Sequence, residues 1–167
     1  MRVLIIGNSG SGKSTYARLL SRRHGIPHLD LDALVWEPGQ IAVARPMDAV
    51  ARDLRAYTQT TPAWVIEGCY GDLAELLLPA CTELVFLNPG LEACLAHTRS
   101  RPWEPQKYAE EADQRRMLPQ LLAWVAEYYT RDDAWSYRFH RRLFEAFPGA
   151  RRELASVPAP QGPAEGT

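Results

Sequence analysis

The stretch Gly7-Asn8-Ser9-Gly10-Ser11-Gly12-Lys13-Ser14-Thr15 decides how the rest of this sequence is interpreted. It fits the pattern G-x-x-x-x-G-K-[S/T], with Gly7, Gly12, Lys13 and Ser14 in the fixed positions. Glycine lets the backbone curl so that successive N–H groups point inward, where they can bind phosphate oxygens. We therefore predict that this loop, called the P-loop below, binds the phosphates of a nucleotide.

The residues around the P-loop support that interpretation. Residues 3–6 form an apolar run typical of a buried parallel strand, and residues 14–24 have the pattern of a helix whose positive end would face the anion. Lys13 would reach the β- and γ-phosphates, and the Ser14 hydroxyl would ligate Mg²⁺. A glycine-rich turn without a ligand is the alternative. Every residue of the loop is a predicted nucleotide contact: Gly7, Asn8, Ser9, Gly10, Ser11, Gly12, Lys13, Ser14 and Thr15.

Composition limits the remaining possibilities. A chain of 167 residues with 46% hydrophobic residues suits a single domain, which we predict over residues 1–157, followed by a disordered tail at 158–167. The net charge of −1 does not favour nucleic acid or an acidic membrane as a partner. No apolar run suits a membrane span, and a strand directly after Met1 leaves no room for a signal peptide.

Cysteine usage points to a reducing compartment. Cys69, Cys81 and Cys94 are odd in number and lack C-x-x-C spacing, which argues against a zinc site or a disulfide framework. We therefore predict a cytoplasmic protein. Its oligomeric state is left open.

Acidic residues follow the next predicted strand. Residues 28–32 are interpreted as a short strand ending in Asp30 and Asp32, and ligands of parallel α/β sheets bind at the carboxyl ends of strands. Both are predicted to face the substrate, and Asp32 could accept a proton from its hydroxyl or hold Mg²⁺-bound water. Alternatively, they are solvated residues at the end of a strand.

The third predicted strand, residues 63–68, ends near Glu67, our candidate for the Mg²⁺ water shell. Which of Asp30, Asp32 and Glu67 is the base and which the metal-shell carboxylate is left open. Residues 33–61 form a predicted substrate-binding insertion. Arg45, just before the helix that Pro46 opens, could hold an anionic substrate there, or it could be a surface arginine.

Residues 99–108 combine prolines, a tryptophan and cations, and we interpret them as a lid. Arg99 and Arg101 would then stabilise the charge of phosphoryl transfer, whereas the alternative is a helix end decorated with arginines that favour its dipole. Residues 130–133 are expected to cap a last helix, and residues 151–157 to form the last strand. Arg131 is a candidate substrate contact, although a structural role is the stronger interpretation.

Four segments carry a family resemblance: Leu31 to Trp36, Trp64 to Gly71, Arg101 to Pro105, and Thr130 to Asp133. With the P-loop, they make the chain similar to the adenylate kinase and shikimate kinase-like group, nearest to bacterial adenylate kinase-like or DNA topology modulation proteins. The resemblance implies a three-layer α/β P-loop NTPase fold, a five-stranded parallel sheet ordered 2-3-1-4-5, and ATP as donor. Residues 67–70 differ from the Gly-Gly-Gly of shikimate kinases and the Asp-Gly-Phe-Pro-Arg of adenylate kinases.

These observations predict a kinase that uses ATP and Mg²⁺. It would transfer the γ-phosphate to a small acceptor, either a nucleoside monophosphate or a hydroxyl metabolite, with Lys13, Asp32, Arg99 and Arg101 as catalytic residues. The alternative is an ATP-binding regulator that uses the nucleotide as a switch. A GTPase is disfavoured because the sequence lacks an Asn-Lys-x-Asp segment for reading guanine.

Overall fold

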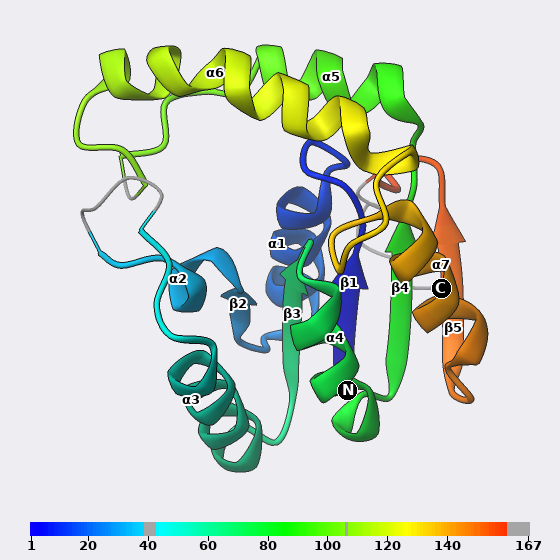
Figure 1. Ribbon diagram of the computed structural model, residues 1–167. Coiled ribbons are helices and arrows are strands. Elements are labelled where there is room, and N and C mark those ends of the chain that lie inside the picture. Colours follow the sequence, from blue (N-terminus) through cyan, green and yellow to red (C-terminus); the bar gives the residue numbers. More distant parts are fainter. Residues whose placement is uncertain (39–42, 106, 160–167) are drawn as a thin grey trace, which may run out of the picture.

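A parallel β-sheet forms the centre of the molecule (Figure 1). The structure is a computed structural model that describes residues 1–38, 43–105 and 107–159. Five strands are arranged in the order β2-β3-β1-β4-β5, and every pairing is parallel. Their bounds are β1 Arg2–Ile6, β2 His28–Asp30, β3 Trp64–Gly68, β4 Glu83–Leu87 and β5 Ala150–Leu154. The predicted strand order is confirmed.

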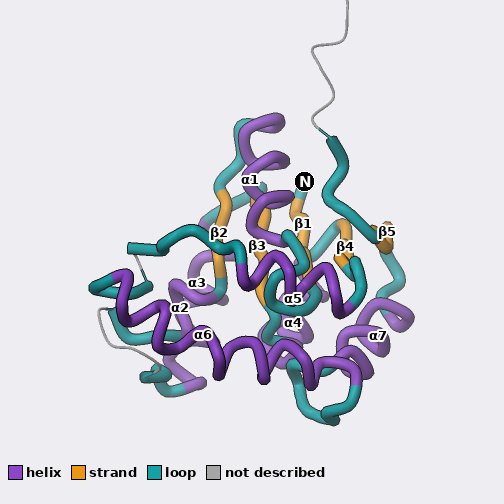
Figure 2. Tube along the Cα trace, turned by 90° about the horizontal axis from the view of Figure 1, so that it is seen from above, coloured by secondary structure: helices purple, strands orange, loops and turns teal. Residues whose placement is uncertain are grey.

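Helices cover both faces of this sheet, because side chains of its strands alternate between two apolar clusters. Leu4 and Ile6 of β1 belong to one cluster, with residues of α3 (Met47–Thr60), α4 (Gly71–Leu77) and α7 (Tyr137–Ala146). Val3 and Ile5 belong to the other, with residues of α1 (Lys13–His24). Figure 2 shows α1 on one side of the strands and α4 and α7 on the other. The three-layer architecture is therefore confirmed.

Two helices lie across the end of the sheet next to the P-loop (Figure 1). They are α5 (Leu91–Arg99) and α6 (Glu111–Ala126), and the predicted lid connects them. A short 3-10 turn, η2 (Glu127–Tyr129), follows α6, and another, η1 (Leu78–Ala80), follows α4. Pro119 lies inside α6, which continues beyond it to Ala126. The expected caps at 130–133 are wrong, because Ser136 caps α7 by accepting a hydrogen bond from the Phe139 N–H.

Strand β2 is shorter than expected because its last residue forms a turn. The Asp30 carboxylate accepts a hydrogen bond from the Asp32 N–H at 2.9 Å, and α2 (Asp32–Val35) begins there. The predicted insertion, residues 33–61, thus contains most of α2 and all of α3, while residues 39–42 lie outside the described part. Most of the predicted tail, residues 160–167, also lies outside it.

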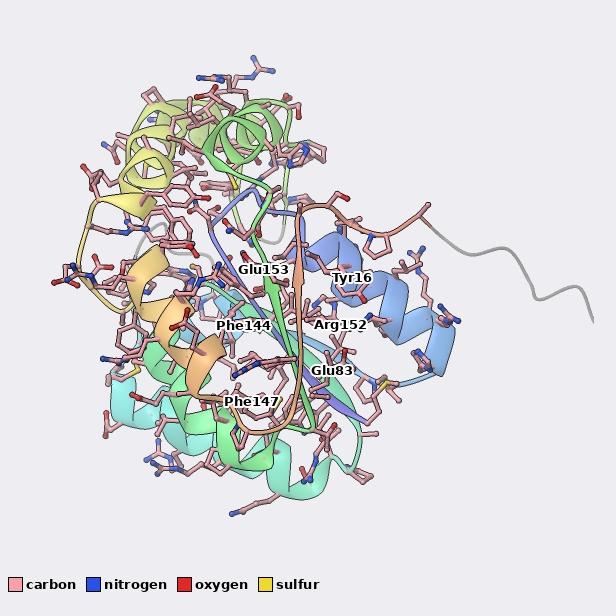
Figure 3. The ribbon with its side chains drawn as sticks, turned by 90° about the vertical axis from the view of Figure 1, so that its right-hand side faces the viewer. Tyr16, Glu83, Phe144, Phe147, Arg152 and Glu153 are labelled. Carbon is pink, nitrogen blue, oxygen red and sulfur yellow. The ribbon has the colours of Figure 1, made fainter. Side chains whose placement is uncertain are left out.

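The edge strand β5 is held by charged side chains (Figure 3). Arg152 donates to Glu83 on β4 at 2.6 Å and to the Tyr16 hydroxyl on α1 at 3.2 Å. Glu153 accepts two hydrogen bonds from Arg141 of α7, at 2.6 and 2.9 Å. Charges of this kind discourage an exposed edge from pairing with another chain.

Among the described helices, none has the length and apolar character needed to cross a membrane. All of the cysteines, Cys69, Cys81 and Cys94, are free thiols. Cys94 of α5 is buried in the core.

Candidate active site

The P-loop connects the end of β1 to the start of α1. Its backbone has φ of +76° at Gly10 and +99° at Gly12, in the left-handed region that glycine adopts without strain. A Cβ at Gly10 would lie 2.3 Å from the carbonyl oxygen of Cys94 in α5, so glycine alone fits between the loop and that helix. The motif therefore forms the tight turn that brings backbone N–H groups toward one point.

Buried polar groups line the P-loop. Lys13 is only 7% exposed, and its ammonium curls back to donate a hydrogen bond to the Asn8 carbonyl at 2.8 Å. Asn8 Oδ1 and Ser11 Oγ are buried and find no hydrogen-bond partner among the described residues. Buried polar atoms in proteins are normally paired, so these groups fit a polar ligand such as a nucleotide phosphate.

The predicted lid and α5 also contact the P-loop. Arg101 Nη2 lies 3.1 Å from Ser9 Oγ, and His97 Nδ1 lies 2.8 Å from the Gly10 carbonyl oxygen. Arg99 is the last residue of α5, and its side chain is exposed. The structure thus brings Arg101 to the P-loop, while catalytic roles for Arg99 and Arg101 stay predictions.

Acidic side chains gather at the carboxyl ends of β2 and β3, where the register pairs Asp30 with Glu67. Burial, followed by the charges of Glu67 and Asp32, raises the pKa of Asp30 to about 6. Burial would also raise the pKa of Glu67. However, contacts to His28 and Ser14 and the charge of Lys13 outweigh it, so that pKa lies below its ordinary value. Glu67 is therefore an ionised carboxylate beside the P-loop.

Glu67 is the carboxylate that best fits a role near a cation. It is 2% exposed, and its Oε1 atom has no hydrogen-bond partner among the described residues, although His28 Nε2 lies 3.6 Å away. No three acidic, histidine or cysteine side chains within the described ranges are arranged to hold a metal by themselves. Mg²⁺ commonly takes few protein ligands and keeps waters and phosphate oxygens, so the pair of Ser14 and Glu67 suits it.

Asp32 stands at the centre of a hydrogen-bonded chain. The Tyr70 hydroxyl donates to Asp32 Oδ1 at 2.6 Å and accepts from Trp36 Nε1 at 2.9 Å. Lys107 Nζ of the lid donates to Asp32 Oδ2 at 2.7 Å. Burial would raise the pKa of Asp32, but Lys107 and Tyr70 outweigh it and keep that pKa below its ordinary value.

The sequence did not identify Tyr70, Trp36 or Lys107 as site residues. Trp36 and Tyr70 lie in the segments that carried the family resemblance, and Lys107 is one of the cations of the lid. The sequence signal for these three residues was therefore their place in the resemblance segments and in the predicted lid. Their partners depend on how β2, β3 and the lid meet in space.

Arg45 lies on the insertion and is engaged within it. Its guanidinium forms an ion pair with Asp53 of α3 at 2.6 Å and donates to the Leu34 carbonyl at 2.9 Å. These contacts join α2 to α3. They give Arg45 a structural role, and its predicted contact with a substrate is untested.

Arg131 lies between aromatic and acidic side chains beyond α6. Its guanidinium carbon is 3.8 Å from the centre of the Trp124 ring, and its Nε atom is 3.5 Å from Asp133. Nη2 donates to the Trp135 carbonyl at 3.3 Å. Burial lowers the pKa of Arg131. Cation–π packing of this kind stabilises the connection between α6 and α7, so Arg131 has a clear structural function besides its predicted one.

A buried histidine joins α7 to the end of β3. His140 is fully buried, with Nδ1 2.8 Å from the Tyr128 hydroxyl and Nε2 3.0 Å from the Cys69 carbonyl oxygen. Burial lowers its pKa to about 3, and the charges of Lys13 and Arg131 act in the same direction. His140 is therefore neutral at physiological pH and anchors the segment that follows Glu67.

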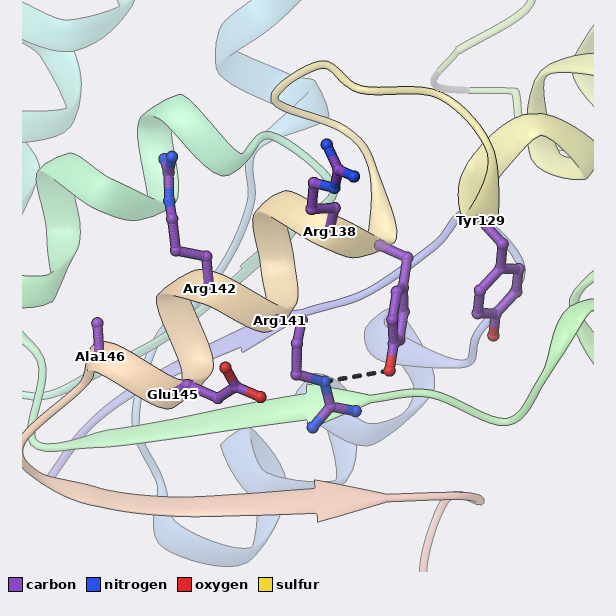
Figure 4. Close-up of a pocket in the computed structure, with 7 residues that line it drawn as sticks. Tyr129, Arg138, Arg141, Arg142, Glu145 and Ala146 are labelled. Carbon is purple, nitrogen blue, oxygen red and sulfur yellow. Dashed lines mark hydrogen bonds between the residues drawn. The ribbon is translucent and has the colours of Figure 1, made fainter.

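A hollow of about 700 Å³ lies away from these groups, along the outer side of α7 (Figure 4). Tyr129, Tyr137, Arg138, Arg141, Arg142, Glu145 and Ala146 line it. Each of its arginines has an acidic partner: Arg138 pairs with Asp132, Arg141 with Glu153 and Arg142 with Glu75. The hollow contains none of the predicted site residues.

Comparison with known proteins identifies the fold. No protein-family model and no curated protein matches the sequence. A gluconokinase from Sinorhizobium meliloti is similar in structure, with 17% identity, 93% of this chain and 83% of that chain covered, and a TM-score of 0.51. An uncharacterized protein from Eubacterium ventriosum has 16% identity, covers 94% of this chain and 91% of its own, and gives a TM-score of 0.50.

A shikimate kinase from Acinetobacter baumannii, solved with shikimate, is also similar in structure. It has 20% identity, covers 85% of this chain and 90% of its own, and gives a TM-score of 0.45. The sheet order, the P-loop and the likeness to the gluconokinase together define the α/β fold of the P-loop kinases. The predicted resemblance to adenylate kinase and shikimate kinase-like P-loop proteins is thus confirmed for the fold.

Proposed function

We propose that the protein is a kinase that uses ATP and Mg²⁺ to phosphorylate a small molecule, either a nucleoside monophosphate or a hydroxyl metabolite. One observation carries the proposal. The same lid contacts the P-loop through Arg101 and the acceptor-side carboxylate Asp32 through Lys107. A lid that touches both groups is suited to closing over a donor and an acceptor held between them.

In this proposal the P-loop binds the ATP phosphates through its backbone N–H groups, and Lys13 neutralises their charge. Ser14 and Glu67 would hold Mg²⁺ with its waters, and the ion would screen the negative charge of the phosphates. Arg101 would stabilise charge on the group in transfer. Water is excluded as the lid closes, which strengthens each of these interactions.

Asp32 would orient the hydroxyl of the acceptor. Its oxygen attacks the γ-phosphorus, the bond from that phosphorus to the ADP oxygen breaks, and the proton passes toward Asp32. The lowered pKa of Asp32 suits an orienting role, because the transition state of phosphoryl transfer is loose and needs little early proton removal. When the acceptor is a phosphate, Asp32 has no proton to receive, and its charge would disfavour the acceptor. A hydroxyl acceptor is therefore the better fit.

The test is ADP release from Mg-ATP in a coupled assay. The acceptor panel holds nucleoside monophosphates, nucleosides, shikimate, gluconate and small polyols. Lys13→Ala should abolish turnover while leaving the circular dichroism spectrum unchanged, and Arg18→Ala, which removes an exposed cation from the same helix, should behave as wild type. Equal activity in Lys13→Ala would end the proposal. ATP binding with no transfer to any acceptor would instead support a nucleotide-dependent switch.

A further inference from the structure

The lid carries a cation that touches both acceptor-side carboxylates. Lys107 Nζ lies 2.7 Å from Asp32 Oδ2 and 3.7 Å from Asp30 Oδ2. The side chain of Lys107 is 26% exposed and that of Asp32 30%, so this contact is more sheltered than an ordinary surface ion pair. Exposed ion pairs contribute little to stability, whereas a sheltered ion pair that includes a hydrogen bond keeps its geometry better.

A third carboxylate, Glu104, connects this cation to the nucleotide side. Glu104 Oε1 lies 3.4 Å from Lys107 Nζ, and its other oxygen, Oε2, lies 3.4 Å from Arg101 Nη1. Arg101 in turn donates to Ser9 in the P-loop at 3.1 Å. An unbroken row of charged and polar groups therefore runs from the P-loop through the lid to Asp32.

We propose that Lys107 is a positioning residue of the acceptor site that holds Asp32 in place. The kinetic consequences rest on the proposed kinase function, whereas the contact between Lys107 and Asp32 does not. Burial would lower the pKa of Lys107, but the charges of Asp32, Asp30 and Glu104 outweigh burial and raise that pKa above its ordinary value. The ammonium therefore stays charged.

Backbone amides of the lid report on this anchor without any substrate. The Tyr108 N–H donates to the Glu104 carbonyl at 3.0 Å, and the Glu104 N–H donates to Gln114 Oε1 at 2.8 Å. Both bonds belong to the turn that presents Lys107. If the ion pair fixes the turn, its removal will let these amides exchange faster with solvent.

The first experiment measures hydrogen exchange of the Glu104 and Tyr108 amides by NMR. Lys107→Met should raise both rates about tenfold, a measurable loss of local stability. Arg115→Met is the matched control, because Arg115 pairs with Glu111 at 2.7 Å on the exposed face of nearby α6. That variant should leave the lid amides within about twofold of wild type.

A double-mutant cycle then assigns the partner. Asp32→Asn should raise the same exchange rates, and combining it with Lys107→Met should add almost nothing, because both changes break one contact. Unchanged exchange in Lys107→Met, or fully additive effects in the double variant, would overturn the proposal.

The second experiment uses an acceptor that the wild-type enzyme phosphorylates. Lys107→Met should lower kcat/KM for that acceptor by about 10- to 100-fold through misplacement of Asp32, with KM for Mg-ATP within about twofold. Lys107→Arg should recover most of the loss. Unaltered acceptor kinetics, or a loss confined to Mg-ATP, would refute the positioning role. If wild type phosphorylates no acceptor, the proposed function fails, and the exchange cycle alone decides whether Lys107 anchors Asp32.

Discussion

Arg101 of the lid donates a hydrogen bond to Ser9 of the P-loop, with 3.1 Å between Nη2 and Oγ. The same guanidinium contacts Glu104 at 3.4 Å, so it is held between the lid and the loop. Arg99, two positions earlier, ends α5 with an exposed side chain. The two arginines that the sequence predicted as catalytic therefore stand in different surroundings.

Under the proposed function, we expect Arg101→Met to lower kcat by about 10²- to 10³-fold, because it would remove a cation from beside the group in transfer. Arg99→Met should lower kcat by less than about tenfold, because the Arg99 side chain is exposed to solvent. Steady-state kinetics at saturating Mg-ATP compares them. A larger loss in Arg99→Met would reverse this assignment and make Arg99 the arginine that enters the site during turnover.

Replacement of Gly10 should lower the free energy of unfolding more than replacement of a glycine in open space. Gly10→Ala places a Cβ 2.3 Å from the Cys94 carbonyl oxygen at a φ of +76°, so it adds a clash to backbone strain. Gly25→Ala is the matched control, because its φ is +63° and its Cβ would meet no described atom within 4 Å. Urea unfolding should show a loss of about 1 kcal/mol for Gly25→Ala and about 2 kcal/mol more for Gly10→Ala. Equal losses would mean that the loop can move away from α5.

His140 should make stability depend on pH in mildly acidic solution. Its folded pKa of about 3 lies below the ordinary 6.5, so between these values the unfolded chain binds a proton that the folded protein does not. This contribution to stability is complete above pH 6.5 and is lost as the pH falls toward 3, at up to about 1.4 kcal/mol per unit.

His140→Gln removes this pH-dependent contribution to stability. The stability advantage of wild type over His140→Gln should therefore shrink by about 2 kcal/mol between pH 7 and pH 5. This change is measured from the unfolding free energies of both proteins across this pH range. Parallel curves for the two proteins would show that His140 is protonated in the folded state or reached by solvent.

Tyr70→Phe should distinguish the contribution of the Tyr70 hydroxyl from that of its ring. The hydroxyl bonds to Asp32 at 2.6 Å and to Trp36 at 2.9 Å, and the rest of Tyr70 is buried in the core. Its removal should cost about 1 kcal/mol of stability and, under the proposed function, lower kcat/KM for the acceptor about tenfold.

Tyr129→Phe is the control for Tyr70→Phe, because its hydroxyl bonds to Asn88 at 2.7 Å, outside the Asp32 network. We expect a similar small change in stability and unchanged acceptor kinetics. Equal kinetics in the two variants would place the Tyr70 hydroxyl outside the working site.

Under the proposed function, Glu67→Gln should raise the Mg²⁺ concentration needed for half-maximal activity. One oxygen of the buried carboxylate has no hydrogen-bond partner among the described residues, and a neutral amide offers less attraction to the waters of a cation. Titration of activity against Mg²⁺ at fixed ATP measures the shift, for which about tenfold is expected. An unchanged requirement would assign the metal-shell role to Asp30 or Asp32 instead.

The sequence predicted those parts of the molecule that depend on neighbouring residues. The P-loop between a buried strand and a helix, and the acidic ends of β2 and β3, follow from local patterns. The sheet order came from the family resemblance. The cap of α7 was misplaced because several polar residues precede that helix, and choosing Ser136 depends on the exact turn that the chain makes there.

The network around Asp32 could not be predicted in the same way. Tyr70 is 38 positions from Asp32 and Lys107 is 75 positions away, so periodicity carries no information about their contacts. Strand β2 also ended earlier than its apolar pattern indicated, because the Asp30 side chain captured the Asp32 N–H. Such contacts are decided by the tertiary structure.

The bond between the Asn8 side chain and the Val125 carbonyl, 3.1 Å long, has a consequence for biosynthesis. Asn8 emerges from the ribosome 117 positions before Val125. The nascent N-terminal half therefore contains the complete glycine-rich motif but lacks the helix that this side chain contacts, and contacts so distant in sequence form late. The Asn8 side chain gains this partner only after most of the protein has been translated.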